Sequence, residues 1–272
     1  MNHVRKNIAV FAVVFVMALN IQTTQAGSAC TIIVEAKSGE VLVQQGACGT
    51  RASPASTFKV ALSLMGFDAG VLVDAHTPAL PYKDEYKAAM ESWRVTTDPT
   101  TWLEDSIVWY SQVLTKTLGP ERFQKHVDGL NYGNRDLAGD AGRNNGLTNA
   151  WLSSSLQISP AEQVAFIRQM VAGRLPVSRQ AVEQTMAIMP SFPATDDWTV
   201  HGKTGSGLQR GADGKLNRDL QFGWFVGWAT MGKRTVVFAT LVQDSEKIDD
   251  RAGIRVRGEL IEALPALLAA RK

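Results

Sequence analysis

The chain has few of the residues that bind metals and no motif that binds phosphates. It holds two cysteines and four histidines in 272 residues, and the histidines lack the paired spacing typical of a metal site. No glycine-rich phosphate loop follows a strand-like segment. We therefore expect no metal and no bound cofactor. The scattered histidines are His3, His76, His126 and His201.

Runs of charge of one sign are also missing. Lysines and arginines are interspersed with acidic residues, and the formal net charge is only +2. Because nucleic acid or an anionic membrane surface needs a concentrated basic face, neither is expected as a partner. With 45% hydrophobic and 20% charged residues, the composition favours one globular unit with a sizeable core.

Long apolar segments are scarce, and the one at residues 8–19 lies near the N-terminus. Arg5 and Lys6 precede it, and Thr24-Gln25-Ala26 follows it as a small-x-small cleavage signal. An uncleaved anchor is the weaker alternative, because the segment falls short of the roughly 20 residues that span a bilayer. We expect a signal peptide over residues 1–26 and a mature protein, residues 27–272, that is exported to the periplasm and not held in the membrane.

The two cysteines flank a predicted hairpin. Strand-like segments at 31–36 and 40–45 meet at Ser38-Gly39, and Cys30 and Cys48 lie equally far from Gly39. This symmetry places them opposite each other across the hairpin and so predicts a disulfide between them in an oxidising compartment. The alternative is a pair of reduced, buried cysteines.

Strand-like segments occur at both ends of the mature chain, with helical patterns between them. This order predicts an α+β fold: an antiparallel sheet built from N- and C-terminal strands, flanked by helices, with a mostly helical lobe inserted between them. We expect residues 27–272 to form one catalytic domain of two lobes. The C-terminal strands are expected at 201–205, 221–230 and 234–243, and helices at 55–65, 105–119, 121–130, 160–173, 179–189 and 252–270.

A serine and a lysine three residues apart open the first helix. Ser56 and Lys59 share one helix face, so the hydroxyl and the amine can meet. A serine hydroxyl needs an adjacent base to become a nucleophile, and burial lowers the pKa of a lysine so that its neutral amine can serve. The alternative is a helix-capping serine beside a lysine that extends to solvent.

Three further triplets follow in the chain. Lys203-Thr204-Gly205 ends or lies on a strand, where a cation and a hydroxyl can bind a carboxylate and a glycine allows close approach. Tyr132-Gly133-Asn134 lies in a loop, and Ser106-Ile107-Val108 opens a buried helix. Each also has an ordinary interpretation: a surface turn for the first two, and a cap followed by core residues for the third.

In their order and separation, these triplets and Ser56-Thr57-Phe58-Lys59 resemble the motifs of the class D serine β-lactamases, the oxacillinase type. The sibling class A enzymes would show Ser-Asp-Asn in place of Ser106-Ile107-Val108. The resemblance extends from about Cys30 to the C-terminal helix and implies the β-lactamase, or penicillin-recognition, fold.

The resemblance implies a nucleophile and an unusual base. Ser56 would attack the β-lactam carbonyl and form an acyl-enzyme. Lys59 would be the family's carboxylated lysine (N6-carboxylysine), so that carbon dioxide or bicarbonate is needed although no cofactor is bound. Trp151 matches the tryptophan whose indole N–H donates to this carbamate, and an ordinary core tryptophan is the alternative.

The resemblance also assigns the remaining site residues. Ser106 would relay a proton to the leaving nitrogen, and Val108 would shield the carbamate. The backbone N–H groups of Ser56 and Ser206 would form the oxyanion hole, although the family often has a bulkier residue at the place of Ser206. The residues expected to bind substrate are Tyr132, Asn134, Lys203, Thr204, Gly205, Ser206 and Arg251.

These assignments predict a hydrolase that opens the ring of penicillin-type antibiotics and confers resistance. A β-lactam sensor that stays acylated is one alternative, although such sensors are normally tied to a membrane protein. A penicillin-binding transpeptidase or carboxypeptidase is another, but it would usually carry Ser-x-Asn. The expected partner is a small-molecule β-lactam, and the protein is expected to be a monomer or a homodimer.

Overall fold

The computed structural model describes residues 29–269. The predicted signal peptide, residues 1–26, lies outside the described residues. Within residues 29–269, no helix combines the length and the apolar character needed to cross a membrane.

A six-stranded sheet organises the molecule, and its strands lie in the order β2-β1-β6-β5-β4-β3. All neighbouring strands pair antiparallel. N-terminal and C-terminal strands therefore share one sheet, which confirms the predicted α+β class. The strands are β1 (Ala29–Glu35), β2 (Val41–Gly46), β3 (Ser191–Pro193), β4 (Thr199–Arg210), β5 (Leu216–Met231) and β6 (Arg234–Gln243).

Helices form the segment between β2 and β3, and one long helix follows β6. The α-helices are α1 (Phe58–Asp68), α2 (Pro99–Glu104), α3 (Val108–Leu118), α4 (Pro120–Gly129), α5 (Gly146–Asn149), α6 (Pro160–Val171), α7 (Arg179–Ala187) and α8 (Ala252–Ala269). Short 3-10 helices are η1 (Ala55–Thr57), η2 (Asp84–Tyr86) and η3 (Glu91–Trp93).

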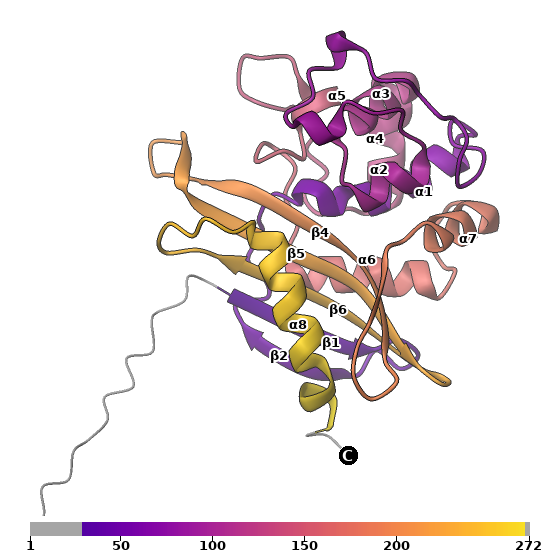
Figure 1. The fold of residues 1–272 in the computed structure, drawn as a ribbon, viewed down its shortest axis with the longest axis vertical. Helices are drawn as coiled ribbons and strands as arrows, with labels where there is room; N and C mark the ends of the chain where they lie inside the picture. The colour runs from indigo at the N-terminus through magenta and orange to yellow at the C-terminus, as the bar shows by residue number, and fades with distance from the viewer. Residues whose placement is uncertain (1–28, 270–272) are drawn as a thin grey trace, which may run out of the picture.

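The sheet separates two hydrophobic cores. One core lies between the sheet and α8, and contains Ile33, Phe225, Val256 and Leu260. The larger core joins the opposite face of the sheet to α6, α1 and the helical lobe. Figure 1 shows α8 across the sheet and the lobe of α1 to α5 gathered beyond β4. A cleft can therefore form where the lobe meets β4.

The central strand β5 explains why the C-terminal segments are so apolar. Trp224, Val226 and Trp228 face the larger core, while Phe225 and Ala229 face the core under α8. Because β5 lies between β4 and β6 and both of its faces are covered, its sequence is apolar without alternation.

The N-terminal hairpin carries the predicted disulfide. Cys30 and Cys48 are bonded at an S–S distance of 2.05 Å. Contrary to the prediction from symmetry, the two cysteines do not lie directly opposite each other in the hairpin. Cys30 instead pairs with Gly46, and the register shifts after Ile33. Cys48 lies two residues past the end of β2, where the chain turns back toward β1.

Helix boundaries follow local chemistry with a few differences from expectation. Ser159 and Glu162 form the capping box that opens α6. The helix predicted from residue 105 begins only at Val108, because Ser106 has a left-handed φ of 61°. The polar segment after Ser206 extends β4 and β5 as a long hairpin, since sheet pairing outweighs its weak strand propensity. The short elements α5 and β3 carry no sequence pattern that predicts them.

Candidate active site

The Ser56 and Lys59 side chains meet as their spacing predicts. Ser56 lies in η1 and Lys59 in the first turn of α1, and the Lys59 Nζ donates to the Ser56 Oγ at 3.0 Å. Ala55, just before the nucleophile position, has a left-handed φ of 48°, which is strained for a residue with a Cβ. The turn that presents Ser56 is therefore held by its surroundings.

Lys59 is fully buried, with 0% of its surface exposed. Burial lowers the pKa of its amine well below the usual value, and the charge of Lys203 lowers it further. Among the described residues, Lys59 forms no ion pair with a carboxylate. Burial therefore favours the neutral form of this amine, which can act as a base or a nucleophile.

A second serine and lysine pair lies nearby: Ser106 lines the same cleft as Ser56, and Lys203 lines an adjoining hollow. The Lys203 Nζ, on β4, donates to the Ser106 Oγ at 3.0 Å, although the two residues are 97 positions apart. Lys203 is 2% exposed. Burial, followed by the nearby charge of Arg257, lowers its pKa to about 7, while Asp105 acts in the opposite direction. Lys203 can therefore hold or release a proton beside Ser106 near neutral pH.

Gly205 permits the close contact between β4 and the nucleophile turn. A Cβ at Gly205 would lie 2.9 Å from the Pro54 carbonyl oxygen. A Cβ at Gly253, in the first turn of α8, would lie 2.4 Å from the Gly205 carbonyl oxygen. The backbone N–H of Gly253 also donates to the Ser206 Oγ at 2.9 Å. Backbone packing thus holds Ser206 at the mouth of the cleft.

Trp151 lies in the aromatic cluster that buries the start of α1. Its ring centroid is 5.5 Å from that of Phe58, the residue before Lys59, and 6.4 Å from that of Phe123. Its buried indole N–H has no hydrogen-bond acceptor among the described residues. A buried donor without a partner lowers the stability of the folded state, so an acceptor bound at this N–H would stabilise the site.

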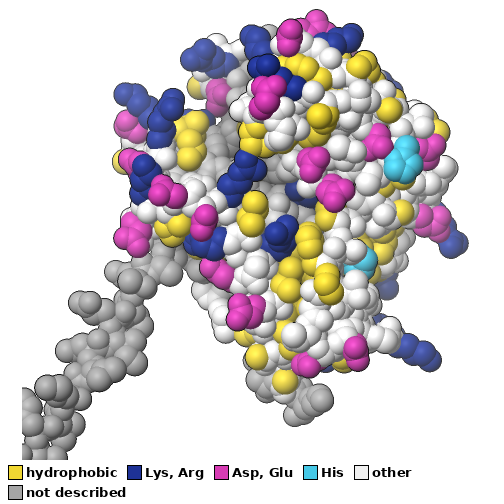
Figure 2. Space-filling view, viewed as in Figure 1, with side chains coloured by type: hydrophobic (Ala, Val, Ile, Leu, Met, Phe, Trp, Pro, Cys, Tyr) yellow, Lys and Arg dark blue, Asp and Glu magenta, His cyan; other side chains and the backbone are white. Residues whose placement is uncertain are grey.

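The cleft between the lobe and the sheet has a volume of about 660 Å³. Figure 2 shows the surface hollowed between the lobe and the sheet, with Lys and Arg side chains at its margin. Of the predicted site residues, Ser56, Ser106, Val108, Thr204, Ser206 and Arg251 line it.

Two arginines approach the cleft from the segment around α8. Arg251 is exposed and contacts the Met90 Sδ across the opening. Arg257, which was not predicted from the sequence, also lines the cleft and is half-buried, with its guanidinium 4.7 Å from the centre of the Phe192 ring. Only the spacing of arginines in the final helix could have indicated Arg257 as a further cation of this site.

Tyr132 and Asn134 do not reach the cleft. Tyr132 is 0% exposed, and its hydroxyl accepts from the Gln163 Nε2 inside the core. The side chain of Asn134 donates to the Ser155 carbonyl and accepts from the backbone of Gln157. Neither residue lines the cleft, and their role in substrate binding stays a prediction. Asn134 holds the loop that follows Trp151, whereas Tyr132 packs against Phe58 in the core.

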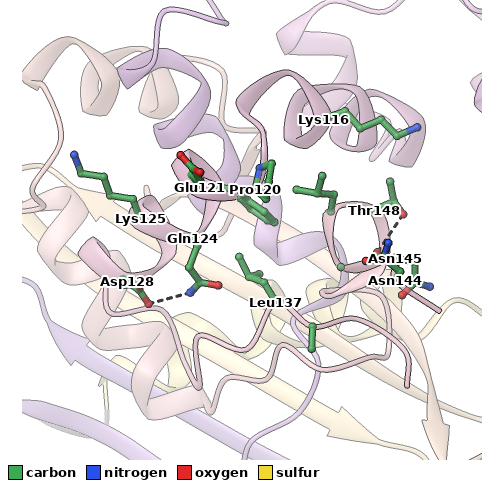
Figure 3. A pocket seen from close by; sticks show the side chains of 14 residues that line it. Lys116, Pro120, Glu121, Gln124, Lys125, Asp128, Leu137, Asn144, Asn145 and Thr148 are labelled. Carbon is green, nitrogen blue, oxygen red and sulfur yellow. Dashed lines mark hydrogen bonds between the residues drawn. The ribbon is translucent and has the colours of Figure 1, made fainter. Parts of the chain in front are cut away.

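A larger hollow of about 1250 Å³ lies elsewhere, between α3, α4 and the loop that precedes α5. Figure 3 shows its lining side chains, with Gln124 directed toward Asp128. None of the predicted site residues lines it. The size of a hollow therefore does not locate the chemistry here.

Comparisons with known proteins agree with this geometry. The family model described as the penicillin-binding protein transpeptidase domain matches residues 29–266. The chain is 44% identical over 240 residues to β-lactamase OXA-9 of Klebsiella pneumoniae, covering 88% of both chains. It is 39% identical over 201 residues to β-lactamase OXA-1 of Escherichia coli, covering 73% of this chain and 70% of the relative.

A solved structure gives the same result in three dimensions. The crystal structure of the class D β-lactamase OXA-427 is similar with a TM-score of 0.83 and 45% sequence identity, covering 89% of this chain and 99% of that chain. Together with two serine–lysine pairs whose serines line one cleft, these similarities show that the chain belongs to the class D, oxacillinase-type, serine β-lactamases, which are hydrolases.

Proposed function

We propose that this enzyme hydrolyses penicillin-type β-lactams through an acyl-enzyme on Ser56, with a carboxylated Lys59 as general base. The observation that carries the proposal is the buried amine of Lys59, which lies 3.0 Å from the Ser56 Oγ and forms no ion pair with a carboxylate within residues 29–269. A neutral amine adds to carbon dioxide, releases a proton and becomes an anionic carbamate. The indole N–H of Trp151, which has no acceptor in the part of the chain that the structure describes, supplies a donor for this anion.

Acylation begins when the carbamate removes the Ser56 proton and the Oγ attacks the lactam carbonyl carbon. Ser56 lies at a helix start, where N–H groups lack partners within the helix. Its N–H and that of Ser206 are proposed to stabilise the oxyanion. As the C–N bond breaks, the Ser106 hydroxyl protonates the leaving nitrogen and is itself resupplied by Lys203, whose pKa of about 7 suits this transfer.

Deacylation uses the same base. Before this step, the carbamate releases the proton that it took from Ser56 to water, and Lys203 takes up a proton from water. The carbamate then takes a proton from a water molecule, which attacks the ester carbonyl, and passes this proton to the Ser56 oxygen as that oxygen leaves. The products are the free enzyme and a ring-opened β-amino acid. Val108 lines the cleft beside these groups and is proposed to limit the access of other water to the carbamate.

The substrate carboxylate is proposed to bind Lys203 and Thr204. The Lys203 Nζ lies 3.5 Å from the Thr204 Oγ1, so a cation and a hydroxyl are presented together. Arg251 and Arg257 add positive charge from the segment around α8. Of the two, Arg257 is the half-buried one and lowers the pKa of Lys203, which favours it as the stronger contributor.

The proposed setting is the periplasm, reached through a cleaved signal peptide, where the enzyme would confer resistance. The disulfide between Cys30 and Cys48 supports export, because such bonds persist in oxidising compartments.

Mass spectrometry with a penicillin tests the function. Wild-type protein with bicarbonate is expected to show a transient one-to-one adduct and release of the ring-opened product. Ser56→Ala should form no adduct, and Lys59→Ala should not deacylate. A stable wild-type adduct without product would instead indicate a sensor, and attack on peptidoglycan peptides would indicate a transpeptidase. Carbon-13 NMR with labelled bicarbonate tests the carbamate, and full activity without carbon dioxide would refute it.

A further inference from the structure

Ser53 lies three residues before the nucleophile and touches the loop that carries Trp151. Its side chain is buried, at 7% exposure. The hydroxyl donates to the Trp151 carbonyl oxygen at 2.7 Å and accepts from the backbone N–H of Ser153 at 2.9 Å. One hydroxyl therefore closes both sides of the turn that begins at Trp151.

The backbone around Ser53 is held independently of this hydroxyl. The indole N–H of Trp224, on the central strand β5, donates to the Ser53 carbonyl oxygen at 2.9 Å. Ala52 and Ile158 exchange backbone hydrogen bonds at 2.9 and 3.0 Å. The segment before Ser56 is thus a rigid support, and the Ser53 hydroxyl transmits its position to the tryptophan loop.

The loop needs this support at Ser153. The backbone of Ser153 has a left-handed φ of 52°, which is unfavourable for a residue with a Cβ. Its carbonyl is held from the other side by the Nε of Arg210, at 2.9 Å. Without the Ser53 hydroxyl, the turn would lose two hydrogen bonds next to Trp151 and could relax.

We propose that Ser53 is a positioning residue for the carboxylation of Lys59, because it holds the Trp151 indole where its N–H can meet the carbamate. This inference rests on the proposed function. In the reaction, the lone pair of the Lys59 nitrogen bonds to the carbon of carbon dioxide, one C–O π pair becomes the carboxylate charge, and the nitrogen releases a proton to water. Ser53 touches none of the reacting atoms and acts through Trp151.

The test is the bicarbonate dependence of Ser53→Ala. The concentration of bicarbonate that gives half-maximal activity is expected to rise about tenfold, which corresponds to the loss of one well-placed hydrogen bond. At saturating bicarbonate, kcat should return to within about twofold of wild type, because the catalytic groups are intact. The carbamate signal in carbon-13 NMR should weaken in parallel at low bicarbonate.

Matched variants separate positioning from stability. Ser53→Thr keeps the hydroxyl and should retain the wild-type bicarbonate dependence. Ser111→Ala removes another buried hydroxyl, one that accepts from the indole N–H of Trp102 at 2.9 Å, and should lower stability without changing the bicarbonate requirement. If Ser53→Ala does not fold, Ser53→Cys gives the same comparison, since a thiol has similar size but bonds weakly.

The outcomes are distinguishable. If wild-type protein shows neither a carbamate signal nor a bicarbonate requirement, the proposed function fails and this inference fails with it. If the wild-type signal is present and Ser53→Ala has the same bicarbonate requirement as Ser111→Ala, the positioning role alone is refuted.

Discussion

Replacing Trp151 by phenylalanine tests whether its indole N–H donates a hydrogen bond to a carbamate on Lys59. The ring is fully buried, and its N–H has no acceptor within residues 29–269. A buried donor without a partner costs about 1 to 3 kcal/mol, which the substitution would recover. The smaller ring leaves a void of roughly 30 to 40 Å³, which costs about 1 kcal/mol at 24 cal/mol per Å³.

Because phenylalanine buries less apolar surface than tryptophan, the substitution lowers the free energy of unfolding by about 1 kcal/mol more. Without bicarbonate, these terms nearly cancel, and the free energy of unfolding of Trp151→Phe should lie within about 2 kcal/mol of wild type, given the spread of such values. With bicarbonate, the variant lacks a charge-assisted hydrogen bond of about 1.5 to 3 kcal/mol. The equilibrium constant for carboxylation should then fall roughly 10- to 150-fold.

Urea denaturation with and without bicarbonate measures both effects. Wild-type stability should rise with bicarbonate, because a group that adds only to the folded state stabilises it by mass action. Trp151→Phe should gain much less, and its activity should need more bicarbonate. Trp102→Phe is the control: its indole N–H already donates to Ser111, so it should be destabilised equally in both buffers. Trp151→Phe behaving like this control would refute the reasoning.

Three further predictions address stability and charge. Replacing both Cys30 and Cys48 by alanine should lower the free energy of unfolding in urea by about 3 kcal/mol, from the closure of an 18-residue separation, with little change in activity at 25 °C. Arg257→Gln removes a charge that lowers the Lys203 pKa, so the decline of kcat/KM as Lys203 loses its proton above about pH 7 should move to higher pH; an unmoved decline would contradict this assignment. Glu162→Gln keeps the α6 capping geometry but removes a carboxylate whose pKa is lowered to about 2, mainly by its hydrogen bonds from Arg51. That stabilisation is present above pH 4.5 and is lost as pH falls toward 2. The free energy of unfolding of the variant in urea should therefore be lower than that of wild type by about 0.5 to 1 kcal/mol near neutrality and equal to it near pH 2.

Local sequence patterns determined the parts of the site that neighbouring residues build. The spacing of Ser56 and Lys59 predicted their contact, because positions i and i+3 share a face in any helical turn. The N-terminal hairpin, its disulfide and the capping box of α6 are likewise products of short-range geometry. The order and separation of the motifs along the chain were also sufficient to indicate the family.

Long-range packing decided the rest. The contact between Ser106 and Lys203 spans 97 positions and depends on how the helical lobe lies against β4. The burial of Tyr132, which removes it from the cleft, follows from its place under Phe58 and Gln163 in the larger core. The approach of Arg257 to the cleft follows from the way α8 crosses the sheet.

The burial of Lys59 depends both on local sequence and on long-range packing. The sequence by itself placed a lysine on an apolar helix face next to a serine. Whether that lysine reaches solvent depends on what covers the face, and no spacing in the sequence states it. The tertiary structure packs Trp151 against Phe58 at the start of α1 and brings Lys203 near, and this burial and charge lower the pKa of Lys59.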